Sequence, residues 1–268
     1  MRVAAIQFCA GLRKQDNVSR ALAMVEEAAQ KGAELVVLPE MFALYGNLGL
    51  AAAEAEPIPG DLSRQLCKLA KRHRILLSAG SFAEQSGQTG LAYNTNLLIS
   101  PQGEVLATYR KMHRFDVEIP GQVSAKESSH FLAGDDCSPI TWDSRRFGTA
   151  ICYDLRFPEL FRKLSRQGLD VLLLPSAFTK TTGRDHWHVL VRARAIENQV
   201  FVIAANQVGE HVPGVSSFGH SLIVDSWGRI LGEAGGESEE ILLADLDFSQ
   251  QNAVRERVPA LKHRRVIE

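Results

Sequence analysis

The stretch Gly32-Ala-Glu-Leu-Val-Val-Leu-Pro-Glu-Met-Phe42 recurs in the second half of the chain as Gly168-Leu-Asp-Val-Leu-Leu-Leu-Pro-Ser-Ala-Phe178. Each copy joins a glycine to a nearly continuous apolar run and a proline, which is typical of a strand buried on both faces of a sheet. A second pair of similar segments, 97–106 and 222–231, follows in the same order. Two ordered matches indicate that the halves repeat one set of elements, with chance similarity of buried strands as the alternative.

Short apolar strands alternate with amphipathic helical stretches through both halves, which indicates an α/β fold. If the halves are duplicates, two mixed sheets pack face to face with helices outside. The sequence therefore predicts a four-layer α-β-β-α sandwich of two mixed sheets with an internal pseudo-two-fold repeat, and a site between strand ends of both halves. We expect residues 1–268 to form a single domain. Strands are expected at about 3–8, 34–38, 75–80, 94–100, 104–109, 147–152, 170–174, 200–205, 222–225, 229–231 and 240–244, and helices at about 16–31, 61–73, 158–167 and 185–198.

Composition limits the partners and the compartment. The chain is 45% hydrophobic and 23% charged, and its 30 Lys and Arg nearly balance its 31 Asp and Glu. Without a basic block, neither nucleic acid nor a membrane is expected as a partner. The chain enters a strand at once, with no targeting peptide, and has no apolar run of membrane-spanning length, so we expect a cytoplasmic protein. The short basic cluster 262–265 is expected to be a solvated or subunit-contacting tail.

Cysteine and histidine spacing gives no sign of a metal. Cys9, Cys67, Cys137 and Cys152 form no C-x-x-C pair, and the eight histidines lack the spacing of metal ligands. We therefore expect no metal and no cofactor.

Cys152 stands where an apolar strand gives way to a helix, in Phe147-Gly-Thr-Ala-Ile-Cys-Tyr-Asp-Leu-Arg-Phe-Pro-Glu159. Such an elbow presents a side chain at the carboxyl edge of the sheet, where ligands of α/β proteins bind. The helix N-terminus there favours a thiolate. This placement favours a nucleophile, although a buried cysteine acting as a small core hydrophobe is the alternative.

Two further polar residues follow predicted strands. Glu40 comes directly after an apolar run and Pro39, so we expect it to be partly desolvated, as suits a general base. Lys111 ends the strand expected at 104–109. Each could instead be a solvated surface group. A thiol nucleophile needs a base and a donor for the developing oxyanion, and these two residues supply both without a histidine.

These residues lie in segments that resemble the nitrilase superfamily of carbon–nitrogen hydrolases, and are most similar to its Nit-type amidase branch. The resemblance covers essentially the whole chain. It implies that Glu40 is the general base, Lys111 the oxyanion stabiliser and Cys152 the nucleophile, with Glu127 as a supporting glutamate. It also implies the four-layer sandwich and a homodimer or higher homo-oligomer that pairs the helices around 156–167 and 185–198. The segments that carry it are 38–42, 109–113, 115–121 and 151–159, supported by 176–178, 182–187, 192–197 and 218–221.

The residues after the cysteine bear on the substrate. Cys152-Tyr-Asp154 is similar to amidases, whereas Cys-Trp-Glu is usual in nitrilases, and Leu155-Arg-Phe-Pro158 is similar to deaminated-glutathione amidases and ω-amidases. We therefore expect a small-molecule amide as substrate. The terminal or γ-amide of a small α-keto diacid would be cleaved through a thioester, with release of an amine or ammonia. The alternatives are an ω-amidase acting on α-ketoglutaramate or α-ketosuccinamate, or another amidase or nitrilase of the superfamily.

Four residues are candidates for binding this substrate. The backbone N–H of Tyr153 would share the oxyanion with Lys111. Arg156, Arg184 and His186 are candidates for the substrate carboxylates, with a structural ion pair as the alternative for Arg156.

Three other interpretations of the thiol are alternatives to this amidase. A redox-sensing protein would use Cys152 without Glu40 or Lys111, and no neighbouring cysteine could resolve it. A papain-like protease would need a histidine base such as His186 or His220. A non-catalytic copy of the scaffold would usually have lost one of the three motif residues, and all three are present.

Overall fold

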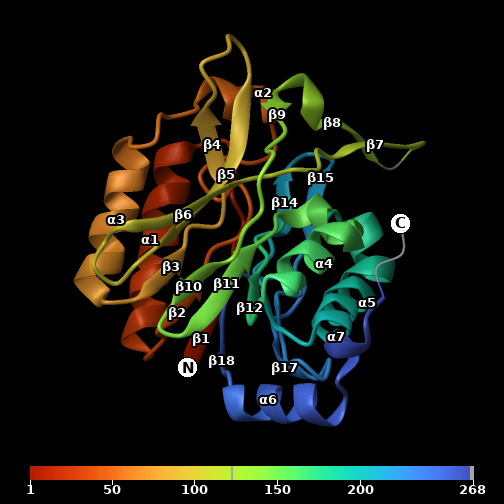
Figure 1. The fold of residues 1–268 in the computed structure, drawn as a ribbon. Coiled ribbons are helices and arrows are strands. Elements are labelled where there is room, and N and C mark those ends of the chain that lie inside the picture. The colour runs from red at the N-terminus through yellow and green to blue at the C-terminus, as the bar shows by residue number, and fades with distance from the viewer. Residues whose placement is uncertain (122, 266–268) are drawn as a thin grey trace.

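A computed structural model describes residues 1–121 and 123–265 of the chain. Its larger sheet has the strand order β18-β1-β2-β3-β5-β4, and β6 and β9 also pair with β5 (Figure 1). The strands are β1 (Arg2–Gln7), β2 (Leu35–Val37), β3 (Leu76–Ser78), β4 (Phe82–Gln85), β5 (Ala92–Ile99), β6 (Val105–Arg110), β9 (Phe131–Leu132) and β18 (Glu240–Asp245). The helices of this half are α1 (Lys14–Gln30), α2 (Leu48–Ala53) and α3 (Asp61–His73).

The second sheet has the order β10-β11-β12-β13-β16-β17. Its strands are β10 (Ile140–Trp142), β11 (Arg145–Thr149), β12 (Val171–Leu173), β13 (Phe201–Ala204), β16 (Leu222–Val224) and β17 (Ile230–Glu233). Two hairpins stand apart from both sheets: β7 (Asp116–Ile119) with β8 (Val123–Lys126), and β14 (Val208–Val212) with β15 (Val215–Phe218). The remaining helices are α4 (Pro158–Arg166), α5 (Lys180–Asn198), α6 (Phe248–Arg257) and α7 (Ala260–His263), with 3-10 turns at Glu127–Ser129 and Cys152–Arg156.

The two sheets repeat one topology. In the first, β1, β2 and β3 are parallel and are followed by antiparallel β5 and β6; in the second, β11, β12 and β13 are parallel and are followed by antiparallel β16 and β17. The repeated sequence segments fall on β2 and β12, and on the β5–β6 and β16–β17 hairpins. Both sheets also gain an antiparallel strand at the same edge, β18 beside β1 and β10 beside β11. The predicted internal repeat is therefore present.

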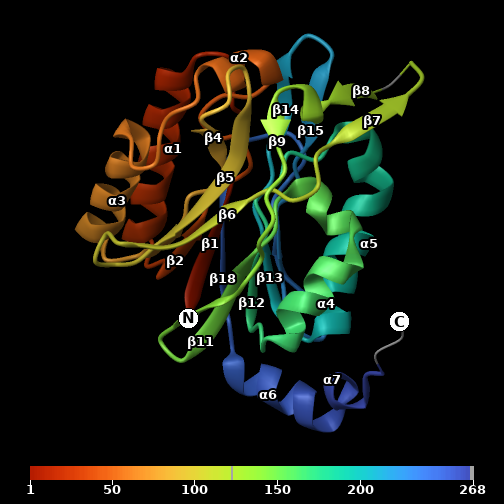
Figure 2. The same cartoon turned by 45° about the horizontal axis from the view of Figure 1, so that its top comes forward.

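Three apolar clusters account for the four layers. One lies between the two sheets and includes Val37, Leu76, Leu173 and Ile203. The other two lie on the outer faces, where α1 and α3 cover the first sheet and α4 and α5 cover the second (Figure 2). Because every central strand is covered on both faces, the strands are short continuous apolar runs. The α-β-β-α sandwich prediction is confirmed.

Several predicted bounds were wrong. β11 ends at Thr149, three residues before Cys152, and α5 begins at Lys180 rather than near 185 because Thr179 caps it. The polar stretch 117–138, in which none of the expected strands and helices falls, contains most of a hairpin, a 3-10 turn and a short strand. The β14–β15 hairpin and α6 were also not anticipated, because their sequences contain few apolar residues and no clear apolar period. Of the described helices, none has the length and apolar character needed to span a bilayer.

Candidate active site

The carboxyl ends of the strands bring Glu40, Lys111 and Glu127 together. Lys111 Nζ donates to Glu40 Oε1 and to Glu127 Oε2, at 2.8 Å each. All three side chains are buried, with at most 5% of any of them exposed. Asn94 Nδ2 donates to both carboxylates, at 2.9 Å to Glu40 and 3.2 Å to Glu127. The ammonium and amide hydrogens together hold the two buried carboxylates in fixed positions. They also supply the pairing and hydrogen bonds that a buried charge requires.

The repeat places Glu40 beside its counterpart in the second half. Glu40 follows β2, and its backbone N–H donates to the carbonyl of Ser176, which follows β12. Gln207 Nε2 donates to the carbonyl of Glu40 at 2.9 Å. The two strand ends therefore meet at the pseudo-two-fold axis, and the predicted position of the site between the halves is supported.

Cys152 lies at a strained elbow. Its φ is +47°, a left-handed conformation that non-glycine residues seldom adopt, and its N–H donates to the carbonyl of Pro175 at 2.9 Å. The residue begins the 3-10 turn that precedes α4. Only 7% of it is exposed, and the Glu40 carboxylate and the backbone N–H of Ala177 lie close enough to its thiol to influence its pKa. The elbow predicted from the sequence is present, and it aims the sulfur at the glutamate–lysine pair.

The surroundings of Cys152 favour the protonated thiol, whereas the helix N-terminus alone would favour a thiolate. Burial and the adjacent Glu40 carboxylate raise the pKa of Cys152 well above its ordinary value, and the Lys111 ammonium only partly opposes them. Desolvation lowers the pKa of Lys111, but Glu127 and Glu40 outweigh it and hold the pKa well above its usual value. Because two carboxylates already face one ammonium, a third anion is unfavourable here. The cysteine therefore needs a base at the moment it reacts.

Asp154 fixes the turn that carries Cys152. Its carboxylate is fully buried and accepts hydrogen bonds from the Ile151 N–H at 2.9 Å, the Tyr109 hydroxyl at 2.6 Å and the His113 N–H at 2.9 Å. Its Oδ1 also lies 2.7 Å from His113 Nδ1. These bonds tie the cysteine turn to β6 and to the residues just after Lys111, so nucleophile and lysine are held by one side chain.

Replacing Asp154 with asparagine is expected to lower the free energy of unfolding by about 2–4 kcal/mol, because an amide cannot accept all of these bonds and leaves buried donors unpaired. Urea denaturation of the purified variant measures this. Asp247→Asn is the matched control, since Asp247 is the exposed N-cap of α6 and asparagine caps equally well. Equal stability of the two variants would contradict the anchoring role.

A cavity of about 840 Å³ opens over these groups. Its volume lies within the usual range for small-molecule sites. The first half of the chain contributes Glu40, Lys111 and Glu127, and the second half contributes Cys152 and Arg184. Other residues of the lining include Tyr45, Asn94, Lys126, His130, Ala177, Lys180, Asp185 and Val215.

Not all of the predicted substrate-binding residues line the cavity. Arg184 lines the cavity, but among the described residues Tyr153, Arg156 and His186 do not. Arg156 Nη1 lies 3.2 Å from His186 Nδ1, and its guanidinium lies over the Phe178 ring. The described partners of Arg156 are thus an imidazole and aromatic rings, and no carboxylate is among them, so the ion pair given as the alternative is not seen. The backbone N–H of Tyr153 stands in the first turn after Cys152, where helical N–H groups lack internal acceptors.

Sequence reasoning missed several residues of this site. Asn94 lies inside β5, and Asp154 and Tyr109 give no motif of their own. Tyr45 lines the cavity, and burial together with the Glu40 charge raises its pKa, so its hydroxyl stays protonated. Glu127 was identified only by resemblance. The spacing of the histidines also gave no sign of a group that lies outside the cavity. His188, His220 and Glu233 place their possible ligand atoms close enough together to hold one metal ion, although His188 and Glu233 are 45 positions apart in the sequence.

Comparison with known proteins agrees with the geometry. The family model described as carbon-nitrogen hydrolase matches residues 2–256. A deaminated glutathione amidase from Synechocystis sp. (strain PCC 6803 / GT-S) is 42% identical over 265 residues, covering 97% of each chain. The human omega-amidase NIT2 is 38% identical over 98% of this chain and 95% of its own. The crystal structure of Saccharomyces cerevisiae Nit3, a member of branch 10 of the nitrilase superfamily, is 33% identical with a TM-score of 0.88, covering 99% of this chain and 97% of that one. The chain therefore belongs to the carbon-nitrogen hydrolase family.

Proposed function

We propose that this enzyme is a cysteine-dependent amidase that hydrolyses the terminal or γ-amide of a small α-keto diacid through a thioester. The observation that carries the proposal is the meeting of the Cys152 thiol, the Glu40 carboxylate and the Lys111 ammonium at the floor of one cavity. The similarity to a deaminated glutathione amidase and to an omega-amidase supports the substrate class.

In the first half of the reaction Glu40 acts as general base. It takes the proton of Cys152 as the sulfur attacks the amide carbonyl carbon, so that an S–C bond forms while no free thiolate accumulates. Glu40 then passes that proton to the departing nitrogen, and the C–N bond breaks. The products are a thioester on Cys152 and a free amine or ammonia.

The oxyanion formed in this step needs donors. Two carboxylates take two of the three N–H groups of Lys111 in the described part of the chain, and the third is available to the oxygen. The Tyr153 N–H is the second donor. Removing one donor of this kind typically lowers turnover by about 10²–10³-fold.

The second half of the reaction returns the enzyme to its starting state. Glu40, again a carboxylate, takes a proton from water as the water oxygen attacks the thioester carbon. The C–S bond breaks, the acid product leaves, and the proton returns to the sulfur. Glu127 takes part only through Lys111, which it holds in place and keeps charged.

The cavity mouth suits an anionic substrate. Lys126, Lys180 and Arg184 line it, and among the described residues of the lining Asp185 is the one carboxylate besides the buried Glu40 and Glu127. All four of the mouth side chains are solvent-exposed. Cations at the mouth attract a diacid, and a guanidinium pairs well with a carboxylate. A cavity of about 840 Å³ also has room for a tripeptide-sized acid.

Arg184→Ala is expected to raise KM for a deaminated-glutathione substrate about tenfold with little change in kcat, because an exposed guanidinium contributes ground-state binding of about 1–2 kcal/mol. KM for a neutral amide such as propionamide should stay the same. Steady-state release of amine or ammonia measures both. His186→Ala is the control, since this residue lies on the same helix outside the lining; equal effects of the two variants would contradict the assignment.

An ω-amidase activity is the second candidate function, and the 38% identity with omega-amidase NIT2 supports it. Values of kcat/KM for deaminated glutathione, α-ketoglutaramate and α-ketosuccinamate, measured under the same conditions, separate the two. A larger value for either small amide would favour the ω-amidase.

The proposed enzyme acts as one domain, as a homodimer, without a cofactor. A dimer is supported by the outer face of α5, where Val189 and Ile196 are exposed, since such side chains favour burial against a second copy. A nucleophilic thiol must stay reduced, which suits the cytoplasm.

A further inference from the structure

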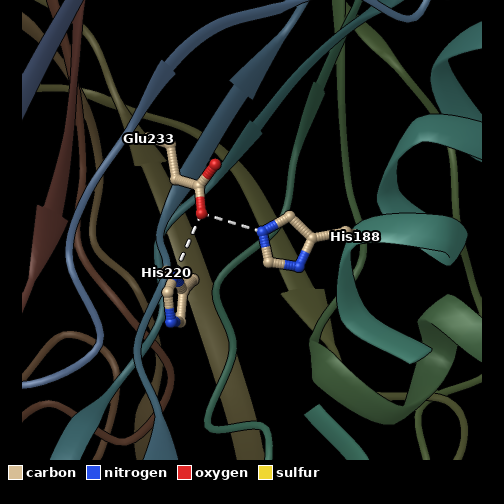
Figure 3. A group of neighbouring side chains, drawn as sticks. All are labelled: His188, His220 and Glu233. Carbon is tan, nitrogen blue, oxygen red and sulfur yellow. Dashed lines mark hydrogen bonds and ion pairs between the residues drawn. The ribbon is translucent and has the colours of Figure 1, made fainter. Parts of the chain in front are cut away.

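A second cluster of titratable side chains lies outside the thiol cavity. It consists of His188 in α5, His220 between β15 and β16, and Glu233 at the end of β17. Figure 3 shows the two imidazole rings pointing at one oxygen of the carboxylate. His188 Nε2 and His220 Nδ1 each lie 2.9 Å from Glu233 Oε1, and one ligand atom of each residue falls within 4.8 Å of the others.

We infer that His188, His220 and Glu233 form a binding site for a divalent transition-metal ion, with Zn²⁺ as the best match. Two imidazole nitrogens and one carboxylate oxygen are a donor set that zinc accepts. Calcium and magnesium prefer all-oxygen sites, so the histidines select against them. With three protein ligands, a fourth position stays open to water or another small ligand.

The distances fit this ion after small movements. Zinc bonds of about 2.0–2.2 Å at tetrahedral angles place ligand atoms about 3.3 Å apart. The carboxylate oxygen therefore has to move only a few tenths of an ångström from each nitrogen, and the two nitrogens already lie within 4.8 Å of each other. All three side chains can make this movement, because about a third of each is exposed to solvent.

The backbone around the cluster is already fixed. The carbonyl of His220 accepts a hydrogen bond of 2.6 Å from Nε1 of Trp187, the fully buried neighbour of His188 in α5. The N–H of His220 donates to the carbonyl of Gly235, just beyond Glu233. The Phe218 ring packs against both imidazoles. The ligand-bearing segments are thus tied to one another in the absence of an ion, which lowers the entropy lost on binding.

The neighbours of Glu233 suit a cation. A carboxylate beside two imidazoles, with no lysine or arginine among its described hydrogen-bond and ion-pair partners, attracts a divalent ion.

The test uses untagged, chelator-treated Cys152→Ala protein, because the catalytic thiol would itself bind zinc. Calorimetric titration with zinc sulfate at neutral pH should show one ion bound per chain. His220→Ala and Glu233→Gln should each weaken binding at least about 100-fold, since loss of even an outer-sphere partner typically weakens it 10–100-fold. His263→Ala, which removes an exposed imidazole from α7, should bind as the parent does. Parent-like binding by His220→Ala, or no binding by the parent, would overturn the inference.

Titration with Co²⁺ identifies the ligand types independently. The cluster predicts visible d–d bands without a near-ultraviolet thiolate-to-cobalt band. A thiolate band would instead locate the ion at a cysteine, for example Cys9, whose sulfur lies 3.8 Å from His211 Nδ1, and would overturn the inference. Both measurements report binding, so their outcome is independent of amidase activity.

Discussion

Cys152→Ala is expected to lower amide turnover by at least about 10⁴-fold, the largest effect of any single change in this chain. The reason is that the sulfur forms the covalent intermediate, and neither Glu40 nor Lys111 can replace it as a nucleophile. Folding should be unaffected, because the thiol is small and its removal leaves the Asp154 anchor intact. Ammonia or amine release from a saturating amide measures the loss, and circular dichroism checks the fold.

The control for this change is Cys67→Ala. Cys67 is a half-buried cysteine in α3 that does not line the cavity, so this variant should keep full turnover. Intact-protein mass spectrometry adds a second readout. Wild-type enzyme mixed rapidly with substrate should show a mass increase equal to the acyl group, and the alanine variant should show none. An alanine variant that still releases amine would refute the thioester scheme, and a wild-type thiol that oxidises but never acylates would favour a redox protein.

The sequence predicted the parts of this site that follow from strand patterning. Glu40 and Cys152 stand directly after buried apolar runs, and the ends of parallel strands in one sandwich must meet at one edge. The similarity of the segments after Gly32 and Gly168 predicted a site between strand ends of both halves, and the hydrogen bond from the Glu40 N–H to the Ser176 carbonyl joins two such ends. Apolar periodicity alone therefore assigns both residues to strand ends.

The remaining residues are placed by contacts that leave no local pattern. Glu127 sits in a 3-10 turn of a polar stretch, and its side chain reaches Lys111 only because β8 ends beside the cavity. Asn94 points inward from β5 because the strand alternates, but nothing in the sequence marks that face as the site. The sequence showed that a helix N-terminus favours a thiolate at Cys152, but not that burial and the Glu40 carboxylate would raise the pKa of this thiol. Resemblance identified Glu127 where patterning could not.

Lys111→Met should have the second-largest effect, acting on both stability and catalysis. Only 2% of Lys111 is exposed, and its ammonium neutralises two buried carboxylates at 2.8 Å. Methionine keeps much of the side-chain volume but leaves both charges uncompensated, so the free energy of unfolding should fall by about 3–5 kcal/mol. Turnover should fall by at least about 10²–10³-fold through loss of the oxyanion donor. Urea denaturation and steady-state amine release measure the two effects.

These two effects can be separated by a second substitution in the same cluster. Lys111→Met combined with Glu127→Gln removes one positive and one negative charge, so only the Glu40 carboxylate stays buried and it still accepts from Asn94. The double variant should therefore regain part of the lost stability, because the repulsion between the two carboxylates is gone. Its turnover should not recover, since no ammonium remains to meet the oxyanion. If turnover returned together with stability, Lys111 would serve only to neutralise its neighbours. The oxyanion would then be stabilised by backbone donors alone, such as the Tyr153 N–H.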